Sequence, residues 1–170
     1  LDLDSDDDGI DDATEAGDDD LSTAPVDSDE DGVADFRDTD SDNDGVLDGE
    51  DTCPTVDNDQ EADLDGDSIG DACDLDLDGD GVSNELEEAF ALNPADPDSD
   101  GDTINDGEEF GEGEEPLDSD EDGDIDALDE DSDNDGVSDA DEAGDAELAT
   151  PAVDTDADGV ADFRDTDSDG

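Results

Sequence analysis

Apolar residues along this chain stand singly among acids and follow neither of the common structural periods. Isolated Ile and Val residues recur between Asp, Ser and Gly, so most of the chain shows no helical stripe and no strand-like alternation. The exception is the segment 84–92, where Leu86 and Phe90 lie four residues apart and Asn93-Pro94 follows as a stop. The pattern predicts an irregular fold with little regular secondary structure and at most a short helix near 84–92.

The acids, in contrast, recur in a fixed frame. In the first instance, which starts at Asp4, carboxylates stand at positions 1, 3, 5, 9 and 12, and Gly9 stands at position 6. This is the ligand spacing of a twelve-residue EF-hand-type calcium loop, in which position 7 offers its backbone carbonyl. Glycine suits position 6 because it adopts positive φ freely and so permits the sharp turn.

Nine complete loops share this frame. They start at Asp4, Asp27, Asp40, Asp63, Asp76, Asp98, Asp118, Asp131 and Asp154, and a tenth loop begins at Asp167. The five side-chain positions of the nine loops make 45 sites, and 44 of them are acidic, which chance placement would not produce. Ser68 and Thr103 replace glycine at position 6 of two loops, and the loop from Asp118 is the least regular because Ile125 is displaced by one residue.

The predicted calcium ligands are the residues at positions 1, 3, 5, 7, 9 and 12 of each loop. They are Asp4, Asp6, Asp8, Ile10, Asp12, Glu15; Asp27, Asp29, Asp31, Val33, Asp35, Asp38; Asp40, Asp42, Asp44, Val46, Asp48, Asp51; Asp63, Asp65, Asp67, Ile69, Asp71, Asp74; Asp76, Asp78, Asp80, Val82, Asn84, Glu87; Asp98, Asp100, Asp102, Ile104, Asp106, Glu109; Asp118, Asp120, Asp122, Asp124, Asp126, Asp129; Asp131, Asp133, Asp135, Val137, Asp139, Glu142; Asp154, Asp156, Asp158, Val160, Asp162, Asp165; and Asp167 and Asp169. Eight of the nine position-7 residues are aliphatic, and we expect them to form a thin apolar seam between neighbouring loops.

The loops follow one another too closely for the flanking helices of EF-hand proteins. Spacings of 13 and 23 residues alternate along most of the chain, so residues 1–170 are expected to form one continuous tandem-repeat array. Dockerins require long helices that a 13-residue spacing excludes, and the GGxGxD nonapeptides of RTX repeats do not occur. In the abutting pairs, the position-12 aspartate lies two residues before the next loop, so we expect it to bridge two ions.

The stretch from Asp40 to Asp74, DSDNDGVLDGEDTCPTVDNDQEADLDGDSIGDACD, resembles the thrombospondin type 3 repeat. Its loops continue over essentially the whole chain, whereas the cysteine signature, Cys53-Pro54 and Cys73-Asp74, occurs once, which is similar to bacterial versions of the repeat. The resemblance implies an elongated, irregular chain wrapped around a row of calcium ions in a secreted or surface protein. It also implies a Cys53–Cys73 disulfide, and a zinc or redox site fits less well because the chain contains no His and no CxxC.

Composition excludes several classes of function. Asp and Glu number 70 against two basic residues, so the net charge is −68, and the chain cannot neutralise nucleic-acid phosphates. No apolar stretch is long enough to insert into a membrane, and the absence of His and Lys removes the usual nucleophile–base pairs, so no enzyme is expected. Nine Ca²⁺ would supply +18 and leave −50, so we expect more than one ion per loop, about 15–20 in all.

A longer repeat is also present. Residues 1–43 align with residues 128–170 without a gap and match at about 30 of 43 positions. We therefore expect the chain to be a slice of a longer array. The only two cations, Arg37 and Arg164, occupy equivalent positions after Phe36 and Phe163. We expect each Arg to pair with nearby carboxylates while its Phe packs on an adjoining loop; a partner-binding Phe-Arg-Asp motif is the alternative.

These observations predict an extracellular or cell-surface calcium-binding structural protein: a spacer, stalk or fibre segment stiffened by calcium. Two alternatives remain open at this stage. The chain could be an adhesin or recognition module that holds a partner through its linkers, or an acidic calcium-storage or mineral-binding protein. Expected partners are calcium ions, together with further copies of the chain or neighbouring domains of a larger surface protein.

Overall fold

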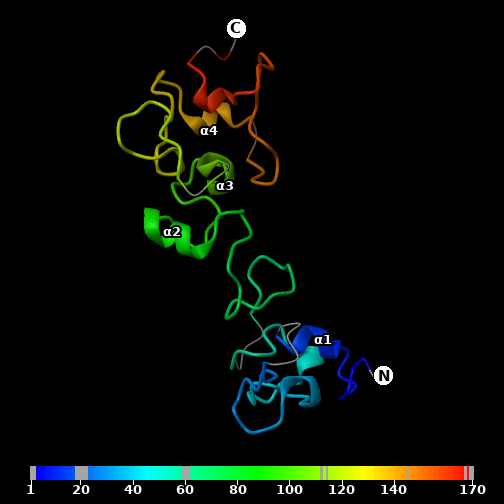
Figure 1. Cartoon of the computed structure of the whole chain (residues 1–170). Helices are drawn as coiled ribbons and strands as arrows, with labels where there is room; N and C mark the ends of the chain where they lie inside the picture. The colour runs from blue at the N-terminus through cyan, green and yellow to red at the C-terminus, as the bar shows by residue number, and fades with distance from the viewer. Residues whose placement is uncertain are drawn as a thin grey trace. The chain divides into compact units, whose positions relative to one another are not determined.

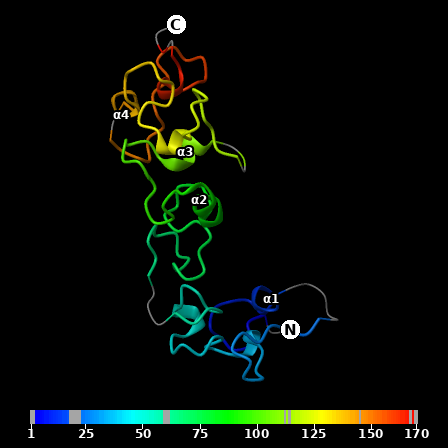
Figure 2. The same cartoon turned by 90° about the vertical axis from the view of Figure 1, so that its left-hand side faces the viewer.

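The structure of the protein is a computed structural model, which describes residues 3–17, 23–58, 62–111, 113, 115–144, 146–166 and 168. The predicted ligands Asp167 and Asp169 lie outside the described residues. The chain divides into two compact units, Leu1–Asp74 and Leu75–Gly170, with the boundary between the fourth and fifth loops. Figures 1 and 2 show each unit as a set of wide open loops joined by short helical turns.

Regular structure is sparse, as predicted, and the described residues contain no strand. The elements are α1 (Asp12–Glu15), η1 (Asp35–Arg37), η2 (Asp48–Glu50), α2 (Asn84–Phe90), α3 (Asp106–Phe110), η3 (Asp126–Leu128), α4 (Asp139–Glu142) and η4 (Asp162–Arg164), where η marks a 3₁₀ turn. Helix α2 confirms the helix expected near 84–92, and it ends where Ala91 adopts a left-handed conformation. The prediction of at most one short helix was wrong, because α1, α3 and α4 also form.

Every one of these elements begins at position 9 of its loop, and the hydrogen bonding explains why. In all nine loops the position-9 N–H donates to the carbonyl of the residue before position 1, with N···O distances between 2.7 and 3.1 Å. Because this bond closes the loop, the chain leaves it in a fixed direction and can start a helical turn. One turn costs little here, since the loop has already ordered its first residue.

The position-9 side chain also closes the loop, by accepting hydrogen bonds from position 2. In the first loop, Ser5 donates its N–H to Asp12 Oδ1 at 2.7 Å and its hydroxyl to Asp12 Oδ2 at 2.9 Å. Ser or Thr stands at position 2 in seven of the nine loops, and the same pair of bonds recurs in each of them. The role of position 2 was not predicted, although the recurrent Asp-Ser-Asp could have revealed it.

Each loop also requires two residues with left-handed backbone. Position 6 has positive φ in all nine loops, including Ser68 at 84° and Thr103 at 83°. Position 4 has positive φ in all nine as well, and residues such as Glu30 at 61° and Ala157 at 63° occupy it without being glycine. The glycine at position 6 was predicted. The left-handed backbone at position 4 was not predicted, because Asn, Asp, Glu or Ala stands there in several loops and none of these residues signals positive φ as glycine does.

Among the described residues, buried apolar side chains form two small clusters, both in the second unit. One contains Val82, Leu92, Phe110 and Ala127, with Phe90 packed edge-on against Phe110 at a centroid distance of 5.6 Å. The other contains Ile104, Ala143 and Phe163. The expected seam of position-7 residues is therefore only partly present: Val82 and Ile104 are buried, but Val33, Ile69, Val137 and Val160 are about 40% exposed. Carboxylates, not aliphatic side chains, occupy the interiors of the loops.

The disulfide between Cys53 and Cys73 is present, with an S–S distance of 2.11 Å. It joins the segment after the third loop to the end of the fourth, and Cys53 is buried. By the chain-entropy model, a link that encloses about 21 residues stabilises the fold by roughly 3 kcal/mol. It is the covalent constraint in a unit that has no sizeable apolar cluster among its described residues.

Close approach between loops depends on two glycines at position 10. A Cβ on Gly107 of α3 would stand 2.0 Å from the backbone oxygen of Asp80, and one on Gly49 would stand 2.2 Å from that of Asp8. Gly107→Ala should therefore destabilise the calcium-bound protein by about 2 kcal/mol, although alanine favours a helix, because the backbone must separate. Ala140, exposed at the same loop position, supplies the control: Ala140→Ser should change stability by less than about 0.5 kcal/mol. Urea unfolding in excess calcium measures both, and an unchanged Gly107→Ala midpoint would contradict this account.

Candidate metal centre

In most of the loops, carboxylates use one oxygen to accept a backbone N–H and bury the other without a hydrogen-bond partner. In the first loop, Asp4 Oδ2 accepts the N–H of Gly9 at 3.2 Å, and Asp8 Oδ1 accepts the N–H of Ile10 at 2.7 Å. Asp6 Oδ1 accepts from the N–H of Asp8 at 3.4 Å. The second oxygens, Asp4 Oδ1, Asp6 Oδ2 and Asp8 Oδ2, are buried without a hydrogen-bond partner, as is Glu15 Oε2.

Carboxylate oxygens of the first three ligand positions also lie close together. Ligand oxygens of Asp4, Asp6 and Asp8 all lie within 4.8 Å of one another, and equivalent triads occur in the loops from Asp27, Asp40 and Asp63. Buried carboxylates without a partner cost several kcal/mol each, and their mutual repulsion adds to that cost. A divalent cation removes both costs at once, since it bonds the oxygens that the backbone leaves unused.

The fifth and sixth loops each contain a fully buried glutamate, Glu87 and Glu109. Both oxygens of Glu87 in α2 and both of Glu109 in α3 are buried without a hydrogen-bond partner. Burial, followed by repulsion from Asp78 and Asp80, raises the pKa of Glu87 to about 8. Burial, followed by repulsion from Asp102 and other acids, raises the pKa of Glu109 to about 11. Among the described residues, neither carboxylate forms an ion pair that would explain its burial.

Position 12 shows a rule that the sequence analysis missed. Where it is Glu, as in Glu15, Glu87, Glu109 and Glu142, the loop continues as an α-helix that contains it. Where it is Asp, as in Asp38, the loop ends in a 3₁₀ turn or a simple turn, and in the four 3₁₀ loops this Asp is the extended residue that ends it. The longer Glu side chain reaches back into its loop from a helical turn, whereas Asp needs the closer approach of extended backbone. The choice between Glu and Asp at position 12 was the sequence signal that could have predicted this difference.

Position 9 was assigned as a ligand of its own loop, and that assignment remains a prediction. Its carboxylate oxygens already accept hydrogen bonds from position 2, as described above. The position-9 residue of the third loop, Asp48, also has a carboxylate oxygen within 4.8 Å of carboxylate oxygens of Asp8 and Glu15 in the first loop. Position 9 therefore orients its own loop and contributes charge to a neighbouring one, so the acids of different loops form connected clusters.

The bridging role expected of position-12 Asp residues has partial geometric support. Asp38 Oδ1 accepts the N–H of Asp40, the first residue of the next loop, at 3.3 Å. Burial, followed by repulsion from Asp31 and Asp29 of its own loop, raises the pKa of the same carboxyl. Asp38 thus faces the acids of one loop while it is anchored to the start of the next, and ion bridging by this residue remains a prediction.

Both arginines stack on the preceding phenylalanine, with Arg37 4.7 Å from the Phe36 centroid and Arg164 4.5 Å from that of Phe163. Arg164 also forms an ion pair with Asp126 at 2.7 Å, and Phe163 packs on the sixth loop. The predicted pairing is confirmed for Arg164. Within the described residues Arg37 makes no ion pair, so the expected pairing of Arg37 stays a prediction.

The raised pKa values predict opposite responses to pH with and without calcium. The unfolded pKa of a Glu is 4.5 and that of folded Glu87 is about 8, so the calcium-free fold binds more protons than the unfolded chain. Its stability should be greatest below pH 4.5 and should fall as pH rises toward 8. Calcium binding requires the ionised groups, so the calcium-bound fold should instead lose ions and order on acidification. Circular dichroism of ion-depleted and calcium-loaded protein between pH 4 and 8 tests this, and parallel curves would refute it.

The chemistry of the donor set fits calcium. Every candidate donor is an oxygen, and short Asp side chains at positions 1, 3 and 5 with a backbone carbonyl at 7 suit a cation that takes six to eight oxygens. Soft metals would require sulfur or imidazole, and the chain contains no His and holds both Cys in the disulfide. The geometry therefore defines a class: an irregular array of oxygen-lined calcium loops.

A further comparison finds a family resemblance in part of the chain. The thrombospondin type 3 repeat family model matches residues 26–61 and 62–87, so these two segments are similar to thrombospondin type 3 repeats, which are calcium-binding repeats. The matched segments include the second to fifth loops and the disulfide, and the remaining loops repeat the same backbone geometry. No match was found among curated proteins.

Proposed function

We propose that this chain is an extracellular spacer or stalk segment that calcium holds in a defined conformation. The observation that supports it best is the set of buried carboxylate oxygens without hydrogen-bond partners in loop after loop. Calcium-binding modules of this kind bind at about 10⁻⁴–10⁻³ M, so calcium outside cells would order the chain and calcium inside would not. The disulfide fits the same oxidising compartment.

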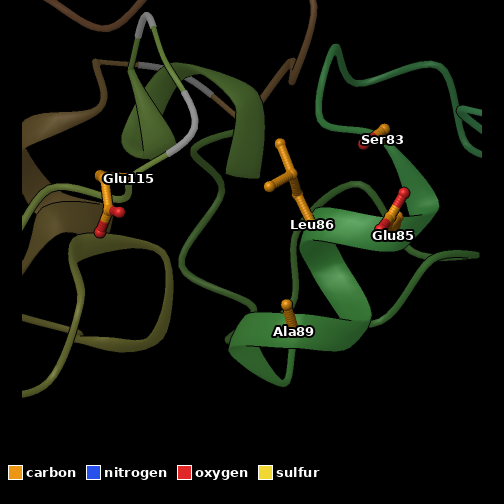
Figure 3. Close-up of a pocket in the computed structure, with 5 residues that line it drawn as sticks. All are labelled: Ser83, Glu85, Leu86, Ala89 and Glu115. Atoms are coloured by element: carbon orange, nitrogen blue, oxygen red, sulfur yellow. The ribbon is translucent and has the colours of Figure 1, made fainter.

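A structural role is favoured over a catalytic one. A hollow of about 420 Å³ beside α2 is lined by Ser83, Glu85, Leu86, Ala89 and Glu115, with Glu115 on the side opposite α2 (Figure 3). The Ser83 hydroxyl in this hollow has no His or Lys to serve as its base, because the chain contains neither residue. No helix within the described residues is sufficiently long and apolar to cross a bilayer.

A calcium store or mineral-binding protein is the runner-up. It needs many exposed, weakly held carboxylates and little order, whereas here Glu87, Glu109 and Asp106 are fully buried in defined loops.

Solution scattering tests the spacer. A compact 170-residue chain would have a radius of gyration of about 15 Å and an unfolded one about 44 Å. The calcium-bound protein should give an intermediate value that stays constant as protein concentration changes, and calcium removal should raise it. A calcium-bound value of about 15 Å with a globular profile would contradict the spacer while leaving calcium binding intact.

A further inference from the structure

Residues 1–43 and 128–170 are copies of one sequence, yet the structure surrounds them differently. In the second copy Phe163 is fully buried and Ser132 is 1% exposed. Their counterparts in the first copy, Phe36 and Ser5, are partly buried and exposed, respectively. Since the sequences match at these positions, the difference lies in what covers them.

In the second copy the cover is the sixth loop with α3, from the same unit. Ile104 fills the space between Ala143 and Phe163. The Arg164 guanidinium donates to the last carbonyls of α3, to Glu108 O at 3.0 Å and to Glu109 O. Together with the ion pair to Asp126, these contacts give the guanidinium one carboxylate and two carbonyl acceptors, and the Arg164 side chain is 16% exposed.

The first copy retains the residues that the sixth loop and α3 contact in the second copy. Ala16, Phe36 and Arg37 are the equivalents of Ala143, Phe163 and Arg164, and each is more exposed than its counterpart. Arg37 stacks on Phe36 in the same way as Arg164 on Phe163. One contact has no equivalent: Ala152 donates its N–H to Glu108, and the matching residue is Pro25, which has no N–H.

We propose that the face formed by Ala16, Phe36 and Arg37 is a docking surface for another calcium-loop repeat of the kind formed by residues 98–127. The fitting partner presents an aliphatic position-7 side chain, to enter between Ala16 and Phe36. It also presents the carbonyl end of a short helix and a carboxylate, to accept from Arg37. This proposal rests on the structural role proposed above and adds the chemistry by which repeats join. It also explains why a chain of net charge −68 places one of its two cations on this exposed face.

The chain offers a simple probe of this surface. Arg37 and Arg164 are its only basic residues and each precedes Asp, so an arginine-specific protease has two matched cleavage sites. In excess calcium we expect cleavage after Arg37 to be at least about tenfold faster than after Arg164, whose surroundings must open first. Calcium removal should expose both sites.

The decisive variant is a chain with a second copy of residues 98–127 fused before Leu1. Because residue 1 aligns with residue 128, the junction reproduces the natural one, and the added segment contains no Arg or Lys. Cleavage after Arg37 should slow about tenfold, to a rate near that of Arg164. Arg37→Ala, almost silent in the original chain, should then lower the unfolding midpoint as Arg164→Ala does. The same extension carrying Ile104→Asp in the added segment should restore fast cleavage.

The outcomes separate this inference from the proposed function. If Arg164 is protected only in calcium but Arg37 is cut equally fast in the original and extended chains, the docking surface is refuted and the calcium-ordered fold stands. If calcium protects neither site, the proposed function fails. Protection of Arg37 by the Ile104→Asp extension would also overturn the inference, because the graft would then shield it without the proposed contacts.

Discussion

Calcium removal should abolish the tertiary structure of this chain. The unpaired oxygens of Asp4, Asp6 and Asp8 are buried within one loop, and the pattern recurs along the chain. Adjacent carboxylates at 4 Å repel by about 1 kcal/mol even in a water-like dielectric, and by about 4 kcal/mol near a protein surface. The small apolar clusters cannot offset dozens of such pairs, so the calcium-free chain at neutral pH should unfold. Far-UV circular dichroism and protease resistance should both be lost.

Readdition of ions provides the control for this experiment. Ca²⁺ should restore the signal, whereas Mg²⁺ should restore it poorly, since Mg²⁺ demands near-ideal octahedral geometry and gives up its water reluctantly. Sodium chloride at equal ionic strength tests simple screening, which should restore little. A chain that keeps the same protease resistance in chelator as in calcium would end the calcium-fold interpretation.

Glu87→Gln should eliminate one calcium site, and Glu88→Gln should not. The two residues are neighbours on α2, but Glu87 is fully buried with both oxygens unpaired, whereas Glu88 is exposed. The substitution keeps size and removes charge and bidentate capacity, so affinity at the fifth loop should fall about 100-fold, since even outer-sphere changes cost 10–100-fold. Native mass spectrometry at about 1 mM calcium should count at least one ion fewer in Glu87→Gln, because sites of this class bind near that concentration.

Stability gives this pair of variants a second readout with opposite signs. In calcium, Glu87→Gln should lower the unfolding midpoint, because the bound ion no longer stabilises the fold. In ion-depleted protein at pH 5, the same change should raise it, because a buried group with a raised pKa is replaced by a neutral one. Glu88→Gln should leave both midpoints within about 0.5 kcal/mol. Equal ion counts for the two variants would remove Glu87 from the ligand set.

The calcium frame could be read directly from the sequence because its signal is local. Alternating Asp residues with glycine at position 6 specify a loop that closes around an ion, and the spacing of 13 residues excludes flanking EF-hand helices. The disulfide followed from the resemblance that Cys53 and Cys73 carry, and the short helix α2 followed from Leu86 and Phe90. All of these depend on neighbours within about twenty residues.

The sequence alone determined the chemistry of this protein, since the identity and order of the acids decide which oxygens can meet within one loop. Only the tertiary structure decided which loops meet each other. The approach of Gly107 to Asp80, the place of Asp48 beside Glu15, and the burial of Phe163 but not Phe36 all depend on contacts between separate loops. The copies around Phe36 and Phe163 are nearly identical in sequence, so no local pattern could distinguish them. Their difference arises from the sixth loop, which covers Phe163 within the second unit.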